Sequence, residues 1–335
     1  MENTTSLTLA DVAVIYAPPF VEVLQNHPLG LIDAGAQGDI GVLWRDFAEA
    51  NPGCLRAVGF EPIPEAAASL MAQPRSDRRY FPVALWNRND RLRLHLAHVP
   101  TCSSIHPPHE ALNRRLYNPG ARVNNWTPRE TVDVVEVDGR RLDDVVAGLE
   151  WDLDVLKVDT QGAELEILDG ASKTLRGLFA VLLETWTVEI HSGQALFHDV
   201  ARTMSNAGFR FMTYELAGLV MQETFHARLS AVGLDSWQVP MRHQVSSLEL
   251  LYFRDSADYV DEADSVYRVA KAAAVADLYG YPDVACELLQ IAATRWPAEA
   301  GRCETLIDVI VTRRVDAARR ATPQNRAQLL PRLHV

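Results

Sequence analysis

The chain has 335 residues, of which 48% are hydrophobic, so it can bury a large core and exceeds the usual size of one domain. Its 32 Lys and Arg residues against 44 Asp and Glu residues give a net charge of -12, which repels phosphate backbones and anionic lipid surfaces. Nucleic acid is therefore excluded as an expected partner. The four cysteines form no CxxC pair, which fits a reducing, cytoplasmic setting. The sequence shows neither a signal peptide nor a run of roughly 18 apolar residues, so we expect no membrane insertion.

Short apolar runs alternate with amphipathic stretches from about residue 29, which is the pattern of a parallel sheet covered by helices on both faces. Two later apolar runs are separated by a long polar connection, so they could pair as an antiparallel edge. We therefore predict an α/β fold with a doubly wound sheet, mostly parallel with an antiparallel edge pair. The predicted strands are 29–35, 55–61, 80–85, 154–159 and 180–184, followed by 209–216 and 246–254.

The composition changes past residue 255, where the sequence becomes alanine-rich with apolar residues at helical spacing. We predict three parts: an N-terminal lead-in segment over 1–28, a ligand-binding domain over 29–255 and a helical C-terminal extension over 256–335. The C-terminal helices could pack on the main domain or against a second copy in a homodimer. We expect residues 29–254 to bind the ligand without them.

A glycine-containing turn follows the first predicted strand, which ends in Asp33 and continues through Gly35 and Gly38. Glycines let the backbone approach a ligand closely, and the helix that follows offers free N–H groups. Glu61 closes the next apolar run, where an acidic side chain can accept hydrogen bonds from the ribose hydroxyls of a nucleoside. The alternatives are an ordinary strand-to-helix turn and an exposed loop glutamate.

Charged residues also end the fourth and fifth predicted strands. Lys157 and Asp159 share one face of a strand, because side chains alternate with a period of two. A buried lysine is costly unless it is paired, so it indicates a site or a structural ion pair. Glu184 ends the next strand, and the carboxylates of successive strands surround the crevice where such folds bind ligands.

These segments carry a resemblance to a known family. The motifs DAGAQG, GFEPIPEAAASL, VALWNRND, CSSIHPP, LDDVV, LKVDTQGAELEILDGA, LLETW and NAGF occur in this order, and together they resemble FkbM-type methyltransferases over about residues 29–254. The most specific part, LKVDTQGAELEILDGA, is similar to the family signature Lys-hydrophobic-Asp-x-(Glu/Gln)-Gly-x-Glu. The resemblance implies a Rossmann-like methyltransferase sheet, S-adenosylmethionine as cofactor, and O-methylation of a hydroxyl group on a sugar, glycan or natural-product acceptor.

The resemblance also implies two groups of site residues. The cofactor-binding group is Asp33, Gly35, Ala36 and Gly38 near the methionine part, Glu61 at the ribose, and Ala84 and Leu85 near the adenine. The catalytic group is Asp159 and Glu184, which would face the reacting methyl, together with Lys157 and His191.

Asp159 and His191 are the candidate bases that draw the proton from the acceptor hydroxyl. Lys157 would keep Asp159 ionised and weakly basic if the two pair, whereas a histidine has a better pKa for a base near neutrality. His106 and His109 are weaker candidates on a loop of the same edge. We expect no metal site, because Pro-Pro separates these two histidines and no third ligand is evident.

Two functions of other classes compete with methyl transfer. A nicotinamide-dependent oxidoreductase would also use a glycine turn and a ribose-binding acid, but the GxGxxG spacing is missing. A non-catalytic binding protein could keep the fold and dock a partner through its helical tail. The presence of Asp33, Glu61, Asp159 and Glu184 favours the enzyme.

Overall fold

The structure, a computed structural model, describes residues 16–38, 40–73 and 75–320. A nine-stranded sheet in the order β3-β2-β1-β9-β10-β12-β11-β6-β7 forms its centre. The strands are β1 (Leu29–Ala34), β2 (Leu55–Phe60), β3 (Arg78–Phe81), β6 (Leu116–Asn118), β7 (Val123–Asn124), β9 (Val155–Val158), β10 (Ala180–Trp186), β11 (Phe209–Gln222) and β12 (Gln244–Arg254). The first five in the sheet order are parallel, and β12 lies antiparallel between β10 and β11. The predicted α/β, Rossmann-like sheet with an antiparallel pair is confirmed.

Both faces of the sheet are covered, and alternate residues of each central strand enter two separate cores. Leu31 belongs to the core on one face, whereas Ile32 and Ala34 belong to the core on the other. Every residue of β1 is buried as a result. This two-sided burial explains why the parallel strands appear in the sequence as continuous apolar runs.

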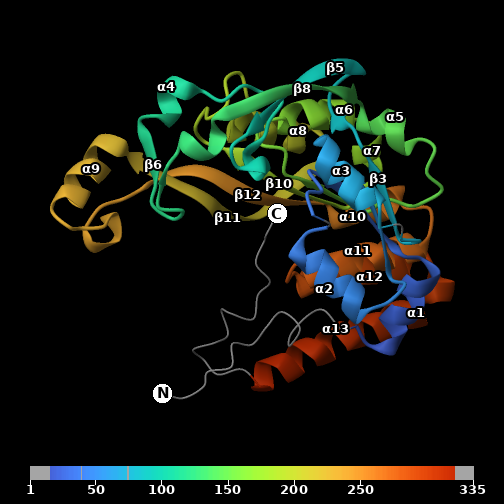
Figure 1. Cartoon of the computed structure of the whole chain (residues 1–335). Helices are drawn as coiled ribbons and strands as arrows, with labels where there is room; N and C mark the ends of the chain where they lie inside the picture. The colour runs from blue at the N-terminus through green and yellow to red at the C-terminus, as the bar shows by residue number, and fades with distance from the viewer. Residues whose placement is uncertain (1–15, 39, 74, 321–335) are drawn as a thin grey trace.

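Helices from both ends of the chain cover the first face, and helices from the middle cover the second (Figure 1). The first group is α1 (Pro18–Asn26), α2 (Val42–Ala50), α10 (Ser256–Glu262), α11 (Val266–Leu278), α12 (Pro282–Arg295) and α13 (Ala300–Arg320). The second group is α5 (Leu142–Val146), α6 (Glu164–Gly170), α7 (Thr174–Gly177) and α8 (Phe197–Asn206). The connections contain α3 (Pro64–Met71), α4 (Glu110–Asn113), α9 (Glu223–Ala231) and the short 3-10 turns η2 (Pro100–Cys102), η3 (Thr127–Arg129), η4 (Ser236–Gln238) and η5 (Pro297–Glu299).

The structure divides the predicted strand over 80–85. Its first part belongs to β3 in the large sheet, and its second part forms β4 (Ala84–Leu85) in a three-stranded sheet of order β4-β8-β5. The sequence did not predict β5 (Asp90–Ala97) or β8 (Thr131–Arg140), because one side of each is exposed and neither is a continuous apolar run. The antiparallel pair β11 and β12 is also not the edge of the large sheet, since β6 and β7 extend it.

The C-terminal helices are part of the main core. Nearly all of α11 is buried, and its residues share one hydrophobic cluster with Leu31, Val155 and Leu182 of the sheet. The buried Lys271 ammonium of α11 lies 3.0 Å from Oδ2 of Asp154, which also accepts a hydrogen bond from the Gly30 N–H at 2.7 Å. The expected boundary at residue 255 therefore marks a change in composition and not a separation in space. The homodimer through these helices stays a prediction, and residues 1–15 and 321–335 of the predicted terminal segments lie outside the described residues.

Within residues 16–38, 40–73 and 75–320, no helix combines the length and the apolar composition needed to cross a bilayer.

Candidate active site

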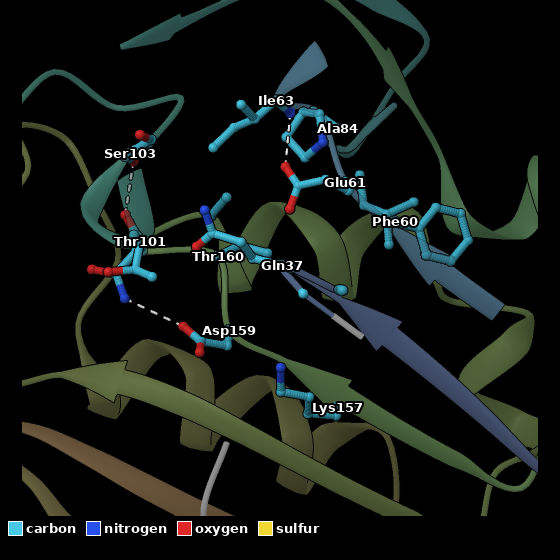
Figure 2. A pocket seen from close by; sticks show the side chains of 18 of the residues that line it. Gln37, Phe60, Glu61, Ile63, Ala84, Thr101, Ser103, Lys157, Asp159 and Thr160 are labelled. Carbon is cyan, nitrogen blue, oxygen red and sulfur yellow. Dashed lines mark hydrogen bonds between the residues drawn. The ribbon is translucent and has the colours of Figure 1, made fainter. Parts of the chain in front are cut away.

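A pocket of about 390 Å³ lies at the carboxyl ends of the parallel strands, within the usual size range of small-molecule sites. Its walls come from the turn after β1, the loops after β2 and β9, strand β4 and the segment around η2 (Figure 2). The predicted residues that line it are Gly35, Gly38, Glu61, Ala84, Leu85, Lys157 and Asp159. Asp33, Ala36, Glu184 and His191 lie outside that lining. The structure thus brings most of the predicted site together at the expected edge of the sheet.

The glycine turn after β1 is fixed by close backbone contacts. Gly35 has a φ of +89°, and a Cβ atom there would lie 1.9 Å from the Asp159 carbonyl oxygen. No residue with a side chain can therefore replace it without moving the backbone. The Gly35 and Ala36 N–H groups both donate to the Phe60 carbonyl at 3.1 Å, so the turn is held against the end of β2.

Glu61 presents a carboxylate at one end of the pocket. The side chain is only 3% exposed, and its Oε1 accepts a hydrogen bond from the Ile63 N–H at 2.7 Å (Figure 2). Burial raises the pKa of Glu61, while the Ile63 N–H acts in the opposite direction. A carboxylate has about four lone-pair sites, so this arrangement leaves acceptor capacity for a ligand.

Lys157 pairs with Asp33, whereas the sequence suggested pairing with Asp159. The Lys157 Nζ lies 3.0 Å from the Asp33 Oδ1, and both side chains are buried. The two residues are direct neighbours in the register of β1 and β9. Burial alone would lower the pKa of Lys157, but the carboxylates of Asp33 and then Asp159 outweigh burial and raise it. The lysine is therefore held as a cation beside the pocket.

Gln161 connects two of the predicted catalytic carboxylates and was missed by the sequence analysis. Its Nε2 donates to Asp159 Oδ1 at 3.3 Å and to Glu184 Oε2 at 3.0 Å. Gln161 has a φ of +56°, which is uncommon for a residue with a side chain, and its carbonyl accepts a hydrogen bond from the Ser104 hydroxyl at 2.7 Å. The Glu/Gln position of the family signature was the signal that could have identified it.

The carboxyl groups of Glu184 and Glu164 lie where burial disfavours their charged forms. Burial, followed by the charge of Asp159, raises the pKa of Glu184 well above its ordinary value. Burial raises the pKa of Glu164 to about 7, although its Oε1 accepts hydrogen bonds from the Gly162 N–H at 2.9 Å and the Thr160 hydroxyl at 3.3 Å. Displaced carboxyl pKa values are typical of functional sites, and Glu164 lies beside the lining residue Thr160.

The three candidate histidines occupy separate positions. His191 is 1% exposed, and burial lowers its pKa to about 3, with the Arg129 charge acting in the same direction. His109 caps α4 by accepting the Leu112 N–H at 3.3 Å, and His106 Nε2 lies 3.4 Å from a Glu166 oxygen. None of the three lines the pocket, so their proposed role as bases stays a prediction.

The part of the chain that the structure describes contains no group of three or more His, Cys, Asp or Glu side chains placed to hold a metal ion.

A family model named Methyltransferase FkbM domain matches residues 33–211, which is more than half of the chain. The chain belongs to the FkbM methyltransferase family. The match begins at Asp33 and includes every predicted site residue, while β12 and helices α10 to α13 lie beyond its end. Membership of the FkbM family favours methyl transfer over the nicotinamide-dependent oxidoreductase.

The chain aligns with different fractions of the length of its individual relatives. It is 30% identical over 178 residues to the 2-O-methyltransferase NoeI of Sinorhizobium fredii, covering 52% of this chain and 70% of that protein. The crystal structure of methyltransferase FkbM from Methylobacillus flagellatus is 14% identical with a TM-score of 0.35, over 67% of this chain and 43% of that one. Magnesium protoporphyrin IX methyltransferase from Synechocystis, solved with bound SAM, is 9% identical with a TM-score of 0.32, over 70% of this chain and 76% of that one.

Proposed function

We propose that this chain transfers a methyl group from S-adenosylmethionine to a hydroxyl oxygen of a sugar, glycan or natural-product acceptor. The observation that carries the proposal is one pocket that joins the Gly35 turn, Glu61 and Asp159 at the strand ends of an FkbM-family chain. The relative NoeI is named a 2-O-methyltransferase, which supports a hydroxyl as the methylated group.

The residues present fit the proposed cofactor. Because Gly35 has no Cβ, the turn after β1 packs directly against the Asp159 backbone, and the turn lines the pocket where the methionine part would lie. Glu61 would accept hydrogen bonds from the ribose hydroxyls, and Ala84 with Leu85 would pack near the adenine. S-adenosylmethionine supplies an electrophilic methyl group on a positively charged sulfur.

The chain must then place the acceptor hydroxyl and receive its proton. We assign Asp159 as the hydrogen-bond acceptor for that hydroxyl, because it lines the pocket at the end away from Ile63 and Ala84 (Figure 2). Gln161 would hold Asp159 and Glu184 in fixed positions through its two hydrogen bonds. His191 is the alternative base, but a pKa of about 3 leaves it weakly basic near neutral pH.

Calorimetry with S-adenosylmethionine, S-adenosylhomocysteine and NAD tests the cofactor. We expect the first two to bind and NAD to show no binding, whereas binding of NAD alone would contradict the proposal. Transfer of a radiolabelled methyl group to a panel of sugars, oligosaccharides and phenols then tests the reaction. Binding without transfer to any hydroxyl compound would favour the non-catalytic alternative.

A further inference from the structure

Arg129, at the end of η3, carries a positive charge close to the proposed reaction centre. Its Nη1 donates to the Asn125 carbonyl at 3.2 Å and to Asn125 Oδ1 at 3.0 Å, and its Cζ lies 5.9 Å from the Trp186 ring centre. Among the described residues, no carboxylate oxygen lies within 4.0 Å of the Arg129 guanidinium, and the Glu184 carboxylate acts on it from a greater distance. Burial lowers the pKa of Arg129, and the opposing charges of Cys102 and Glu184 offset burial only in part.

Three buried donors in this region have no hydrogen-bond partner within the described part of the chain. They are Arg129 Nε, Trp186 Nε1 and Gln194 Nε2. Trp186 and Gln194 both lie against His191. The His191 ring centre lies 6.4 Å from that of Trp186, and the His191 backbone N–H donates to Gln194 Oε1 at 2.6 Å. Buried donors in native proteins are nearly always satisfied, so oxygen atoms of water or of a bound group would complete these hydrogen bonds.

The group lies next to the wall of the pocket on the side of Asp159. The Val99 N–H donates to the Pro128 carbonyl at 3.0 Å, which ties η3 to the segment that contains η2. Thr101 of η2 lines the pocket, and Figure 2 places it with Asp159 on the side away from Ile63 and Ala84. The cation therefore lies near the acceptor end and not near the ribose end.

We propose that Arg129 is the centre of an anion subsite for the methyl acceptor, so that the acceptor carries a carboxylate, sulfate or phosphate group in addition to its reacting hydroxyl. This inference rests on the proposed function. A guanidinium binds oxyanions through paired, charge-assisted hydrogen bonds, and Trp186 Nε1 and Gln194 Nε2 are two further buried donors around His191. These donors are buried in this conformation, so binding of the anionic group requires the chain around them to open.

The test compares the wild type with Arg129→Met and with the control Arg114→Met. Arg114 also stacks on a tryptophan, at 4.7 Å from the Trp126 ring centre, but it is exposed and pairs with Glu110. Each protein, saturated with S-adenosylhomocysteine, is titrated with inorganic sulfate, D-glucuronate and D-glucose. We expect the wild type and Arg114→Met to prefer the two anions over glucose by about tenfold or more, and Arg129→Met to lose that preference.

Two results would overturn the subsite: no preference for the anions in the wild type, or an unchanged preference in Arg129→Met. Thermal unfolding separates binding from structure. Arg129→Met removes two hydrogen bonds to the buried Asn125 together with a buried cation, and these effects oppose each other, so the melting temperature should change little, whereas a large decrease would make Arg129 a structural residue. Binding of S-adenosylhomocysteine in the same samples reports on the proposed function separately, so the two proposals can fail independently.

Discussion

Replacing Glu61 by Gln should weaken cofactor binding about tenfold to a hundredfold, because hydrogen bonds to a charged group contribute about 1.5–3 kcal/mol. Glutamine keeps the shape of the side chain, and its oxygen can still accept the Ile63 N–H that Glu61 accepts at 2.7 Å. The substitution therefore removes the charge offered to the ribose hydroxyls with little change in the loop. Since Glu61 is 3% exposed, solvent does not screen this loss strongly.

The dissociation constant of S-adenosylhomocysteine, measured by calorimetry across pH, checks this prediction. Burial raises the pKa of Glu61, and protonation removes the charged acceptor, so wild-type affinity should fall as the pH is lowered through that pKa. Glu61→Gln should lack this dependence, and Glu65→Gln, an exposed change in the first turn of α3, should behave as the wild type does. A folded Glu61→Gln variant that binds within about twofold of the wild type would refute the ribose role.

Four further predictions concern the fold and the chemistry. Truncation after Arg254 should abolish folding, seen as loss of the cooperative thermal transition, because it removes the buried helix α11. Lys271→Met should lower the free energy of unfolding by about 3–5 kcal/mol in urea titrations, since it leaves Asp154 buried without its cation. Burial raises the pKa of Glu164 to about 7, so the folded state binds this proton more tightly than the unfolded chain does. The free energy of unfolding of the wild type should therefore fall as the pH rises from 4.5 towards 7, and Glu164→Gln should lack that decrease. Gln161→Met should lower single-turnover methyl transfer about tenfold or more, with a smaller effect on cofactor affinity.

Each of these predictions has a contradicting outcome. A cooperatively folded 1–254 fragment would support the domain boundary inferred from composition. Wild-type stability of Lys271→Met would mean that another group balances the buried charge of Asp154. Adding Asp154→Asn should recover part of the loss, which is the internal control. Equal pH profiles of the wild type and Glu164→Gln would exclude Glu164 as the source of the pH dependence, and full turnover by Gln161→Met would exclude Gln161 as a positioning residue.

The parallel part of the sheet was predictable because strands buried on both faces are continuously apolar, as in β1 and β10. The partner of Lys157 was not predictable from the residues around it. Asp159 lies two positions further along the chain, just past the end of β9 and about 6.6 Å away, whereas Asp33 lies directly across the register at about 4.8 Å. Cross-strand neighbours depend on the order of strands, which the local sequence does not contain.

The burial of His191 and the bridging role of Gln161 were hidden for a related reason. His191 lies in a loop whose contacts come from distant segments, such as the antiparallel bridge to Pro108. Gln161 gains its role only when β9 and β10 lie side by side and Ser104 reaches its carbonyl. The sequence therefore identified residues with chemical groups at strand ends and missed those that orient them.

The position of α11 within the core has a consequence for synthesis on the ribosome. Strands β1, β2, β9 and β10 are translated well before residues 266–278, which cover one of their faces. Until that helix emerges, the nascent chain exposes Leu31, Val155 and Leu182, the kind of surface that aggregates or recruits chaperones. Strand β12, which fills the gap between β10 and β11, also arrives late. Completion of this core must therefore wait until residues 266–278 have left the ribosome.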